Sequence, residues 1–153
     1  IVHITINCCS NAKVAHTLSR RAVSPAEFWR RFMSISVLVA DDSKLSRRSV
    51  IRSLPQDLDY DITEATNGKE AIEAIKSGLF SLILLDLTMP EVDGVGVLEY
   101  LHEQQEKPNV IIISADFQPE KQKIVMALGA KRFLRKPLDK EELAMALFEL
   151  GML

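Results

Sequence analysis

Polar side chains with potential for chemistry follow four strand-like segments of the sequence, each at the point where the segment ends. The segment 37–40 is followed by two aspartates, 82–85 by one aspartate, 110–113 by a serine and 131–135 by a lysine. These residues are Asp41, Asp42, Asp86, Ser114 and Lys136. If the segments are parallel strands, their carboxyl ends meet at one edge of a sheet, where open α/β sheets bind ligands. The spacing therefore predicts a single pocket.

The chemistry of this set favours a cation and a phosphoryl group. Three carboxylates at contact distance repel one another, so ionising all of them is unfavourable unless a cation lies among them. Oxygen ligands without histidine or cysteine suit Mg²⁺, which binds carboxylates, waters and phosphate oxygens. Lys136 adds a positive charge, and the Ser114 hydroxyl adds a hydrogen-bond donor. Together these groups are expected to hold a phosphoryl group carried on Asp86.

Asp86 follows a continuous run of aliphatic residues from Leu82 to Leu85. A run without polar alternation is typical of a strand buried on both faces of a parallel sheet. Pro90 cannot continue the hydrogen bonding of a strand, and it biases Met89 towards an extended conformation, so the chain must turn there. We therefore expect Asp86 at an open mouth beyond the strand.

Strand-like and helix-like segments alternate from residue 35 to the end of the chain. Such alternation predicts right-handed crossovers and one parallel, doubly wound sheet. The acids in the second strand place it nearer an edge of the sheet. The predicted strands are 37–40, 60–65, 82–85, 110–113 and 131–135, and the predicted helices are 44–54, 69–77, 95–104, 119–128 and 139–150.

Two of the predicted helices have clear start signals. Ser43 is expected to cap the first helix, and Asp139 is expected to cap the last, with Glu142 completing a capping box. On the first helix, Leu45 is expected to face the core and Arg47 to face solvent.

Composition and charge limit the class of protein. The chain has 153 residues, of which 47% are hydrophobic and 26% charged, as is typical of one domain with a sizeable core. Residues 1–33 carry five Lys or Arg and one acid, whereas residues 34–153 carry fourteen and twenty. An acidic body argues against direct nucleic-acid binding, because affinity for phosphate backbones comes from Lys and Arg. No apolar run approaches the roughly eighteen residues that span a bilayer, so we expect no membrane insertion.

Residues 1–33 differ from the rest of the chain in charge and pattern. We expect a basic, poorly ordered extension or a non-native leader, followed by one folded domain at 34–153. A membrane-surface or targeting helix over 25–32 is the alternative. The two cysteines, Cys8 and Cys9, are adjacent and indicate neither a disulfide framework nor a metal motif. A cytoplasmic location is therefore expected.

The sequence resembles the receiver domain of bacterial two-component response regulators, of the single-domain CheY type. The resemblance covers about residues 34–150 and implies a flavodoxin-like (βα)5 fold, a five-stranded parallel sheet with strand order 2-1-3-4-5. Ser114 stands where the family more often has threonine. The motifs that carry the resemblance are Asp41-Asp42, the segment 86–90 with Gly94 behind it, Ser114-Ala115, and Phe133 ahead of Lys136-Pro137.

The resemblance implies that Asp86 is the phosphoacceptor. It further implies that Asp41, Asp42 and the Thr88 backbone carbonyl hold Mg²⁺ together with Asp86.

The remaining site residues have roles implied by the same resemblance. Lys136 and Ser114 would bind phosphoryl oxygens. Phe133 matches the aromatic switch position, which turns inward when Ser114 moves towards the phosphoryl group. Thr88 and Asp116 each lie two residues past a site residue, and we expect them to tune the lifetime of the phosphoryl group.

The partners implied are a sensor histidine kinase or phosphotransfer protein as donor, and a downstream protein as target. The target is expected to bind the face formed by helix 119–128, strand 131–135 and helix 139–150. A phosphorylation-dependent dimer and a role in chemotaxis are also expected. The implied chemistry is self-phosphorylation and self-dephosphorylation of a switch, and the chain either acts alone or is a receiver from a longer protein.

The main alternative is an enzyme, a Mg²⁺-dependent aspartyl-phosphate phosphatase of the haloacid-dehalogenase type. Those enzymes typically carry a D-x-D motif at the nucleophile, in which the second aspartate is the general acid. Thr88 occupies that second position here. A phosphate-independent receiver-like scaffold is a further alternative. A dinucleotide-binding protein is disfavoured, because no G-x-G-x-x-G follows the first strand.

Overall fold

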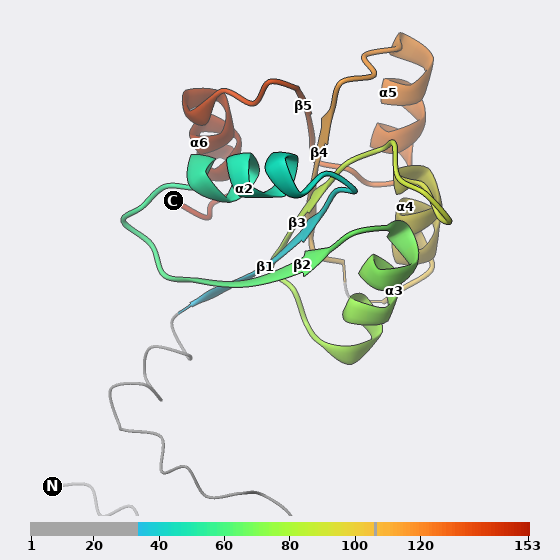
Figure 1. The fold of residues 1–153 in the computed structure, drawn as a ribbon, viewed down its shortest axis with the longest axis horizontal. Helices are drawn as coiled ribbons and strands as arrows, with labels where there is room; N and C mark the ends of the chain where they lie inside the picture. The colour runs from blue at the N-terminus through green and yellow to red at the C-terminus, as the bar shows by residue number, and fades with distance from the viewer. Residues whose placement is uncertain (1–33, 106) are drawn as a thin grey trace, which may run out of the picture.

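The computed structural model describes residues 34–105 and 107–153. The expectations for residues 1–33, including the basic extension and the alternative helix over 25–32, lie outside the described residues. The described part forms a parallel sheet with helices on both faces (Figure 1).

The sheet has five parallel strands in the order β2-β1-β3-β4-β5, which confirms the predicted fold class (Figure 1). The predicted edge position of the second strand is also confirmed, because among the described strands β2 pairs only with β1. The strands are β1 (Ile35–Ala40), β2 (Tyr60–Ala65), β3 (Leu82–Leu85), β4 (Asn109–Ser114) and β5 (Arg132–Arg135).

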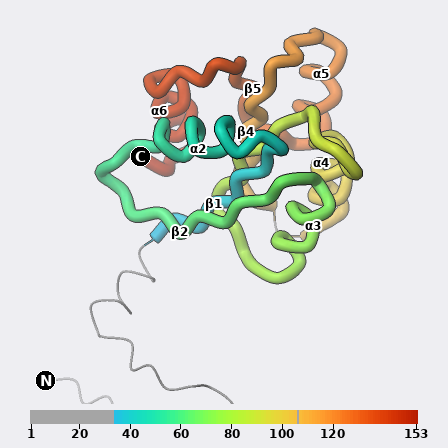
Figure 2. Tube along the Cα trace, viewed as in Figure 1, coloured from blue at the N-terminus to red at the C-terminus, as the bar shows by residue number. Residues whose placement is uncertain are grey.

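The helices of the described chain divide into two layers. Figures 1 and 2 show α2 and α6 on one side of the sheet and α3, α4 and α5 on the other. The helices are α2 (Lys44–Ser53), α3 (Gly68–Ser77), α4 (Gly94–His102), α5 (Pro119–Ala127) and α6 (Lys140–Glu149).

Two apolar cores lie on the two faces of the sheet, because successive side chains of a strand point to opposite faces. Ile83 of β3 packs in the core beneath α3, α4 and α5, whereas Leu84 packs in the core beneath α2 and α6. Every residue of β3 is buried, with exposed fractions of 0 to 1%. The central strand is therefore fixed from both faces, and so is the start of the loop that carries Asp86.

Helix α2 begins as predicted, but its orientation differs from the prediction. The Ser43 side chain accepts a hydrogen bond from the Ser46 backbone N–H at 3.4 Å. Leu45 was expected to face the core and is 78% exposed, whereas Arg47 was expected to face solvent and is 7% exposed. Arg47 and Val50 are three positions apart and both are buried, so Arg47 lies on the face of the helix that packs on the sheet.

The N-cap of helix α6 is the predicted residue, Asp139. The Asp139 side chain accepts hydrogen bonds from the backbone N–H groups of Glu141 and Glu142. A negatively charged cap at this position also interacts favourably with the helix dipole.

None of the helices in the described residues is both long enough and apolar enough to cross a membrane.

Candidate phosphoryl and cation site

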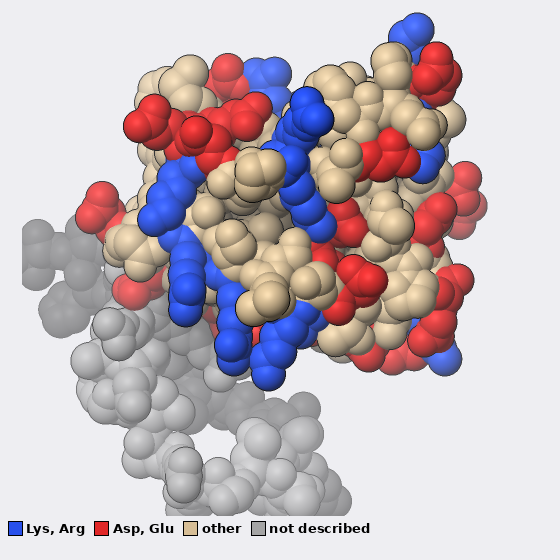
Figure 3. Space-filling view, turned by 45° about the horizontal axis from the view of Figure 1, so that its top comes forward, with Lys and Arg blue, Asp and Glu red and all other residues tan. Residues whose placement is uncertain are grey.

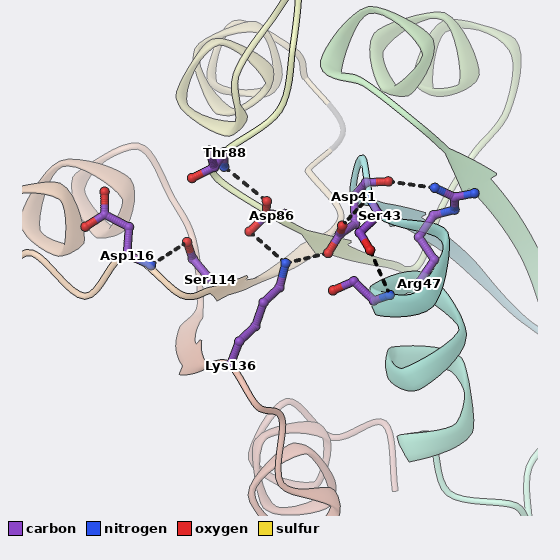
Figure 4. A network of polar contacts seen from close by, with 9 residues as sticks. Asp41, Ser43, Arg47, Asp86, Thr88, Ser114, Asp116 and Lys136 are labelled. Carbon is purple, nitrogen blue, oxygen red and sulfur yellow. Dashed lines mark hydrogen bonds and ion pairs between the residues drawn. The ribbon is translucent and has the colours of Figure 1, made fainter.

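Two buried aspartates lie side by side because β1 and β3 are neighbours in the sheet. Ala40 of β1 pairs with Leu85 of β3, and the next residue of each strand is an aspartate. The Asp86 backbone N–H donates to the Ala40 carbonyl at 2.9 Å, which extends the pairing one step past the strand. Asp41 is 3% exposed and Asp86 is 4% exposed. Figure 4 shows their side chains converging beyond the ends of the strands.

Asp42 completes a cluster of three carboxylates. One oxygen each from Asp41, Asp42 and Asp86 lies within 4.8 Å of the others, and Asp42 is the exposed member. The donors are all hard carboxylate oxygens, and this chemistry fits a small divalent cation such as Mg²⁺. The structure therefore brings together the three aspartates expected to bind the ion.

Lys136 is the cation that the structure places in this cluster. Its Nζ lies 2.5 Å from Asp41 Oδ2 and 3.1 Å from Asp86 Oδ1 (Figure 4). Burial by itself lowers the pKa of the Lys136 ammonium. The hydrogen bond to Asp41 and the charge of Asp86 outweigh this effect, so the pKa is raised above its ordinary value. Lys136 thus stays charged and joins the ends of β5, β1 and β3.

Asp86 is held in a fixed orientation between two donors. Its Oδ1 faces Lys136, and its Oδ2 accepts the Thr88 backbone N–H at 3.2 Å. Burial raises the pKa of the Asp86 carboxyl above its ordinary value, and the positive charge of Lys136 only partly offsets this effect. The ionised Asp86 is therefore short of compensating positive charge, which a bound cation would supply. The Thr88 side chain itself is exposed.

Ser114 ends β4 one strand away from Asp86 and is fully buried (Figure 4). Its hydroxyl oxygen accepts the Asp116 backbone N–H at 3.2 Å, and its carbonyl accepts the Lys136 backbone N–H at 3.0 Å. The Asp116 carboxylate pairs with Lys121 of α5 at 2.5 Å. The two expected residues Ser114 and Asp116 thus form a second polar group beside the carboxylate cluster.

Phe133 lies in β5 and is half-buried against the core beneath α3, α4 and α5. Its ring meets Phe117 edge to face, with centroids 5.5 Å apart and an interplanar angle of 82°. The Arg135 guanidinium lies 5.8 Å from the Phe117 ring centroid. Nothing in the sequence pattern connects Phe117 with Phe133, since their contact depends on the pairing of β4 with β5.

Arg47 also contacts the site, although it was predicted to face solvent. Its Nη1 donates to the Asp41 backbone carbonyl at 2.9 Å, and its Nε donates to Glu64 Oε2 at 2.6 Å. The available signal was helical spacing, because Val50 and Leu54 lie three and seven positions after Arg47 and both are buried.

Gly94 allows α4 to start directly against the strand end that carries Asp86. A Cβ at this position would lie 2.3 Å from the Asp86 carbonyl oxygen and 2.8 Å from the Leu87 Cα. The Gly94 backbone N–H donates to the Leu87 carbonyl at 3.1 Å. Packing therefore explains why glycine occupies position 94, since any side chain there would displace the backbone of the site.

Charge on the surface is uneven. Figure 3 shows Lys and Arg side chains crossing the middle of one face, with acidic side chains on either side. Helix α2 contributes the exposed residues Lys44, Arg48 and Arg52. The acidic excess of the described chain is therefore not spread over every surface.

Comparison with known proteins agrees with this geometry. Residues 37–148 match the family model of the response regulator receiver domain. The chemotaxis protein CheY of Treponema pallidum is 35% identical over 109 residues, which cover 69% of this chain and 75% of that protein. The chain therefore belongs to the response regulator receiver domain family. Receiver domains of this family are signalling switches of two-component systems and bind Mg²⁺ at an acidic pocket.

Solved structures of receivers superpose on the same fold. The signal receiver domain of a putative NarL response regulator from Mycobacterium tuberculosis is 31% identical, with a TM-score of 0.71, over 78% of this chain and 97% of that one. A CheX-CheY-BeF3-Mg+2 complex from Borrelia burgdorferi contains a chain with a TM-score of 0.72 and 27% identity, over 80% of this chain and 93% of that one.

Other curated relatives are much longer than this chain. The match covers 12% of a signal transduction histidine-protein kinase and 25% of a transcriptional regulatory protein, both of Escherichia coli. Receivers of this family thus occur within proteins of different overall activity.

Proposed function

We propose that Asp86 accepts a phosphoryl group from a sensor histidine kinase or phosphotransfer protein, and that this chain passes the signal to a protein target. The observation that supports this most strongly is the bridging position of Lys136, 2.5 Å from Asp41 and 3.1 Å from Asp86. A half-buried lysine between two buried carboxylates could receive phosphoryl oxygens next to the acceptor.

The transfer step follows from the position of the Asp86 carboxylate. One of its oxygens attacks phosphorus, the bond between phosphorus and the donor nitrogen breaks, and the electron pair leaves with the donor imidazole. The Thr88 N–H and Lys136 hold the carboxylate in one orientation, which reduces the entropic cost of attack. Lys136 neutralises charge that builds on the phosphoryl oxygens, and the Ser114 hydroxyl donates to one of them.

Asp41, Asp42 and Asp86, with the Thr88 backbone carbonyl, would hold Mg²⁺. One carboxylate oxygen of each aspartate lies within 4.8 Å of the others. When bound, the ion would supply positive charge beside the phosphoryl oxygens. The same charge would stabilise the ionised Asp86 carboxylate, whose pKa is raised by burial.

The switch that we propose runs from Ser114 to Phe133. When Ser114 moves towards the phosphoryl group, the space it leaves lets Phe133 turn inward, away from its contact with Phe117. This changes the face of α5, β5 and α6, where the target docks or where two phosphorylated copies pair. Exposed apolar side chains on α6 suit such a docking surface, since Met145 is 64% exposed and Phe148 is 69% exposed.

Thr88 and Asp116 would tune how long the phosphoryl group persists. Thr88 is exposed beside Asp86, and Asp116 is held by Lys121 next to Ser114. In this proposal both residues would flank the approach of water to the phosphoryl group. Decay of the phosphorylated protein after removal of the donor is the measurement that checks this role.

The similarity to a chemotaxis protein favours a role in chemotaxis signalling. A cytoplasmic location remains a prediction. The phosphatase alternative is less well supported, because Thr88 has no acidic side chain to protonate a leaving alcohol. We therefore favour a switch, with only self-phosphorylation and self-dephosphorylation, over an enzyme that turns over a phosphate ester.

The test is incubation of the full chain with Mg²⁺ and acetyl phosphate, followed by mass spectrometry of the intact protein. We expect the parent to gain one phosphoryl group that is labile, and Asp86→Asn to gain none. Asp57→Asn, which removes an exposed aspartate before the amino end of β2, is the matched control and should behave like the parent.

A parent that gains no phosphoryl group while still binding Mg²⁺ would contradict the proposed chemistry with this donor and favour the phosphate-independent scaffold. Sustained hydrolysis of a phosphate ester such as p-nitrophenyl phosphate would instead support the phosphatase alternative.

A further inference from the structure

Arg47 is a buried charge that contacts the backbone of the carboxylate cluster. Within the described residues, its hydrogen bonds reach none of the cluster's carboxylate oxygens. It is 7% exposed, and charged side chains are almost never so buried unless they are paired. Its guanidinium uses two different donors, Nη1 for the Asp41 carbonyl and Nε for Glu64 on β2 (Figure 4 shows the first). One side chain of α2 thus links the end of β1 to the edge strand.

The contacts of Asp41 show what this link does. The Asp41 N–H donates to the Ala65 carbonyl at 3.1 Å, and the Ser43 N–H donates to Asp41 Oδ1 at 2.8 Å. With Arg47 on its carbonyl, the main chain of Asp41 is held from both sides. The peptide that joins Asp41 to Asp42 therefore has one orientation.

Asp42 depends on that peptide for its position. Unlike Asp41 and Asp86, Asp42 is exposed, so packing does little to hold its side chain. The orientation of the peptide before Asp42 sets the direction of its Cα–Cβ bond, and hence the direction in which its carboxylate reaches the cluster. A carboxylate that must be ordered on binding costs conformational entropy, which a fixed backbone reduces.

We propose that Arg47 is a positioning residue of the cation site, which orients the Asp42 carboxylate through the Asp41–Asp42 peptide and is itself held by Glu64. This assignment rests on the proposed function, since it concerns the same divalent cation. Arginine suits the role because its planar group presents donors in a fixed fork, whereas lysine has a single ammonium. The alternative is that Arg47 only links α2 to β2 and contributes to stability alone.

The test is the Mg²⁺ dissociation constant of the metal-free full chain, measured by isothermal titration calorimetry. Arg47→Lys keeps the positive charge but cannot hold both partners, and we expect about tenfold weaker binding, as for other residues that orient metal ligands. Arg48→Lys changes the adjacent, exposed arginine of the same helix and should bind like the parent. Glu64→Gln, a milder change that keeps the side-chain shape, should weaken binding in the same direction by a smaller factor.

A second readout separates positioning from stability. In ¹⁵N-labelled, metal-free protein, Arg47→Lys should shift or broaden the Asp42 amide signal, while amides of β4 remain unchanged. If Arg47→Lys and Glu64→Gln lower resistance to urea but leave the dissociation constant unchanged, the assignment is overturned and the arginine is only a structural link. If the parent itself binds no Mg²⁺, the proposed function fails together with the assignment.

Discussion

At the scale of single residues, the site is governed by the competition between burial and charge at Asp86. A neighbouring lysine ordinarily lowers the pKa of a carboxyl group, yet the pKa of Asp86 is raised because burial has the larger effect. Lys136 is shared with Asp41, so its charge is divided between two carboxylates. The unphosphorylated, metal-free protein thus carries an ionised Asp86 at some cost in stability.

This cost predicts a pH-dependent effect of Asp86→Asn. The pKa of Asp86 is higher in the folded than in the unfolded protein, so the folded state binds more protons between the two values. Stability then falls as pH rises through that window. In the presence of a chelator, Asp86→Asn should therefore raise the midpoint of thermal unfolding at neutral pH. The gain should disappear as pH falls below the ordinary aspartate pKa of 3.8.

Thermal unfolding of parent and variant across this pH range checks the prediction. Asp57→Asn should show no comparable gain, because its carboxylate is exposed. A variant less stable than the parent at neutral pH would mean that the ion pair with Lys136 outweighs the burial of Asp86.

At the scale of elements, the connection from β3 to α4 limits how the site can be built. Gly94 has no room for a Cβ, which would lie 2.3 Å from the carbonyl oxygen of Asp86. The start of α4 and the end of β3 are therefore in direct backbone contact. A change at this glycine moves the residue that carries the chemistry.

We expect Gly94→Ala to lower the free energy of unfolding by about 2 kcal/mol, the usual range for an overpacked site, and to slow phosphorylation by acetyl phosphate. Gly78→Ala is the control, because its Cβ would approach no atom closer than 3.9 Å and its backbone is extended, with φ of −153°. Urea unfolding of the two variants gives the comparison. Equal stability of Gly94→Ala and the parent would show that the backbone can yield at this contact.

Element type was most predictable where a strand is buried on both faces and leaves an unbroken aliphatic run, as in β3. Element ends were less predictable, since helix 95–104 is observed as α4, Gly94–His102. The predicted orientation of α2 was wrong at Leu45 and Arg47 because a buried, paired arginine looks the same in sequence as a solvated one. Its burial depends on Glu64, seventeen residues away.

The site residues at the strand ends could be predicted because a parallel sheet brings those ends together. Their detailed contacts could not, as Lys136 lies 95 residues from Asp41 and its bridging position depends on the packing of β5. The ring contact between Phe117 and Phe133 has the same origin.

At the scale of the whole molecule, β4 and β5 connect the proposed phosphoryl site to a surface. Ser114 ends β4 at the site, and Phe133 of β5 pairs with Ile112 of β4 two residues before that serine. An ion pair between Arg132 and Glu149 joins β5 to α6. A movement at Ser114 can therefore reach the α5, β5 and α6 face through neighbouring strands.

The most direct test of the central claim is a crystal structure of the full chain with Mg²⁺ and beryllofluoride, which mimics an acyl phosphate. We predict beryllium bonded to an Asp86 carboxylate oxygen, with Mg²⁺ about 2.1 Å from oxygens of Asp41 and Asp42. Lys136 and Ser114 should contact the fluorine atoms, and Phe133 should be turned inward. An adduct on another residue, or a cation bound away from the three aspartates, would contradict the assignment of Asp86 as phosphoacceptor.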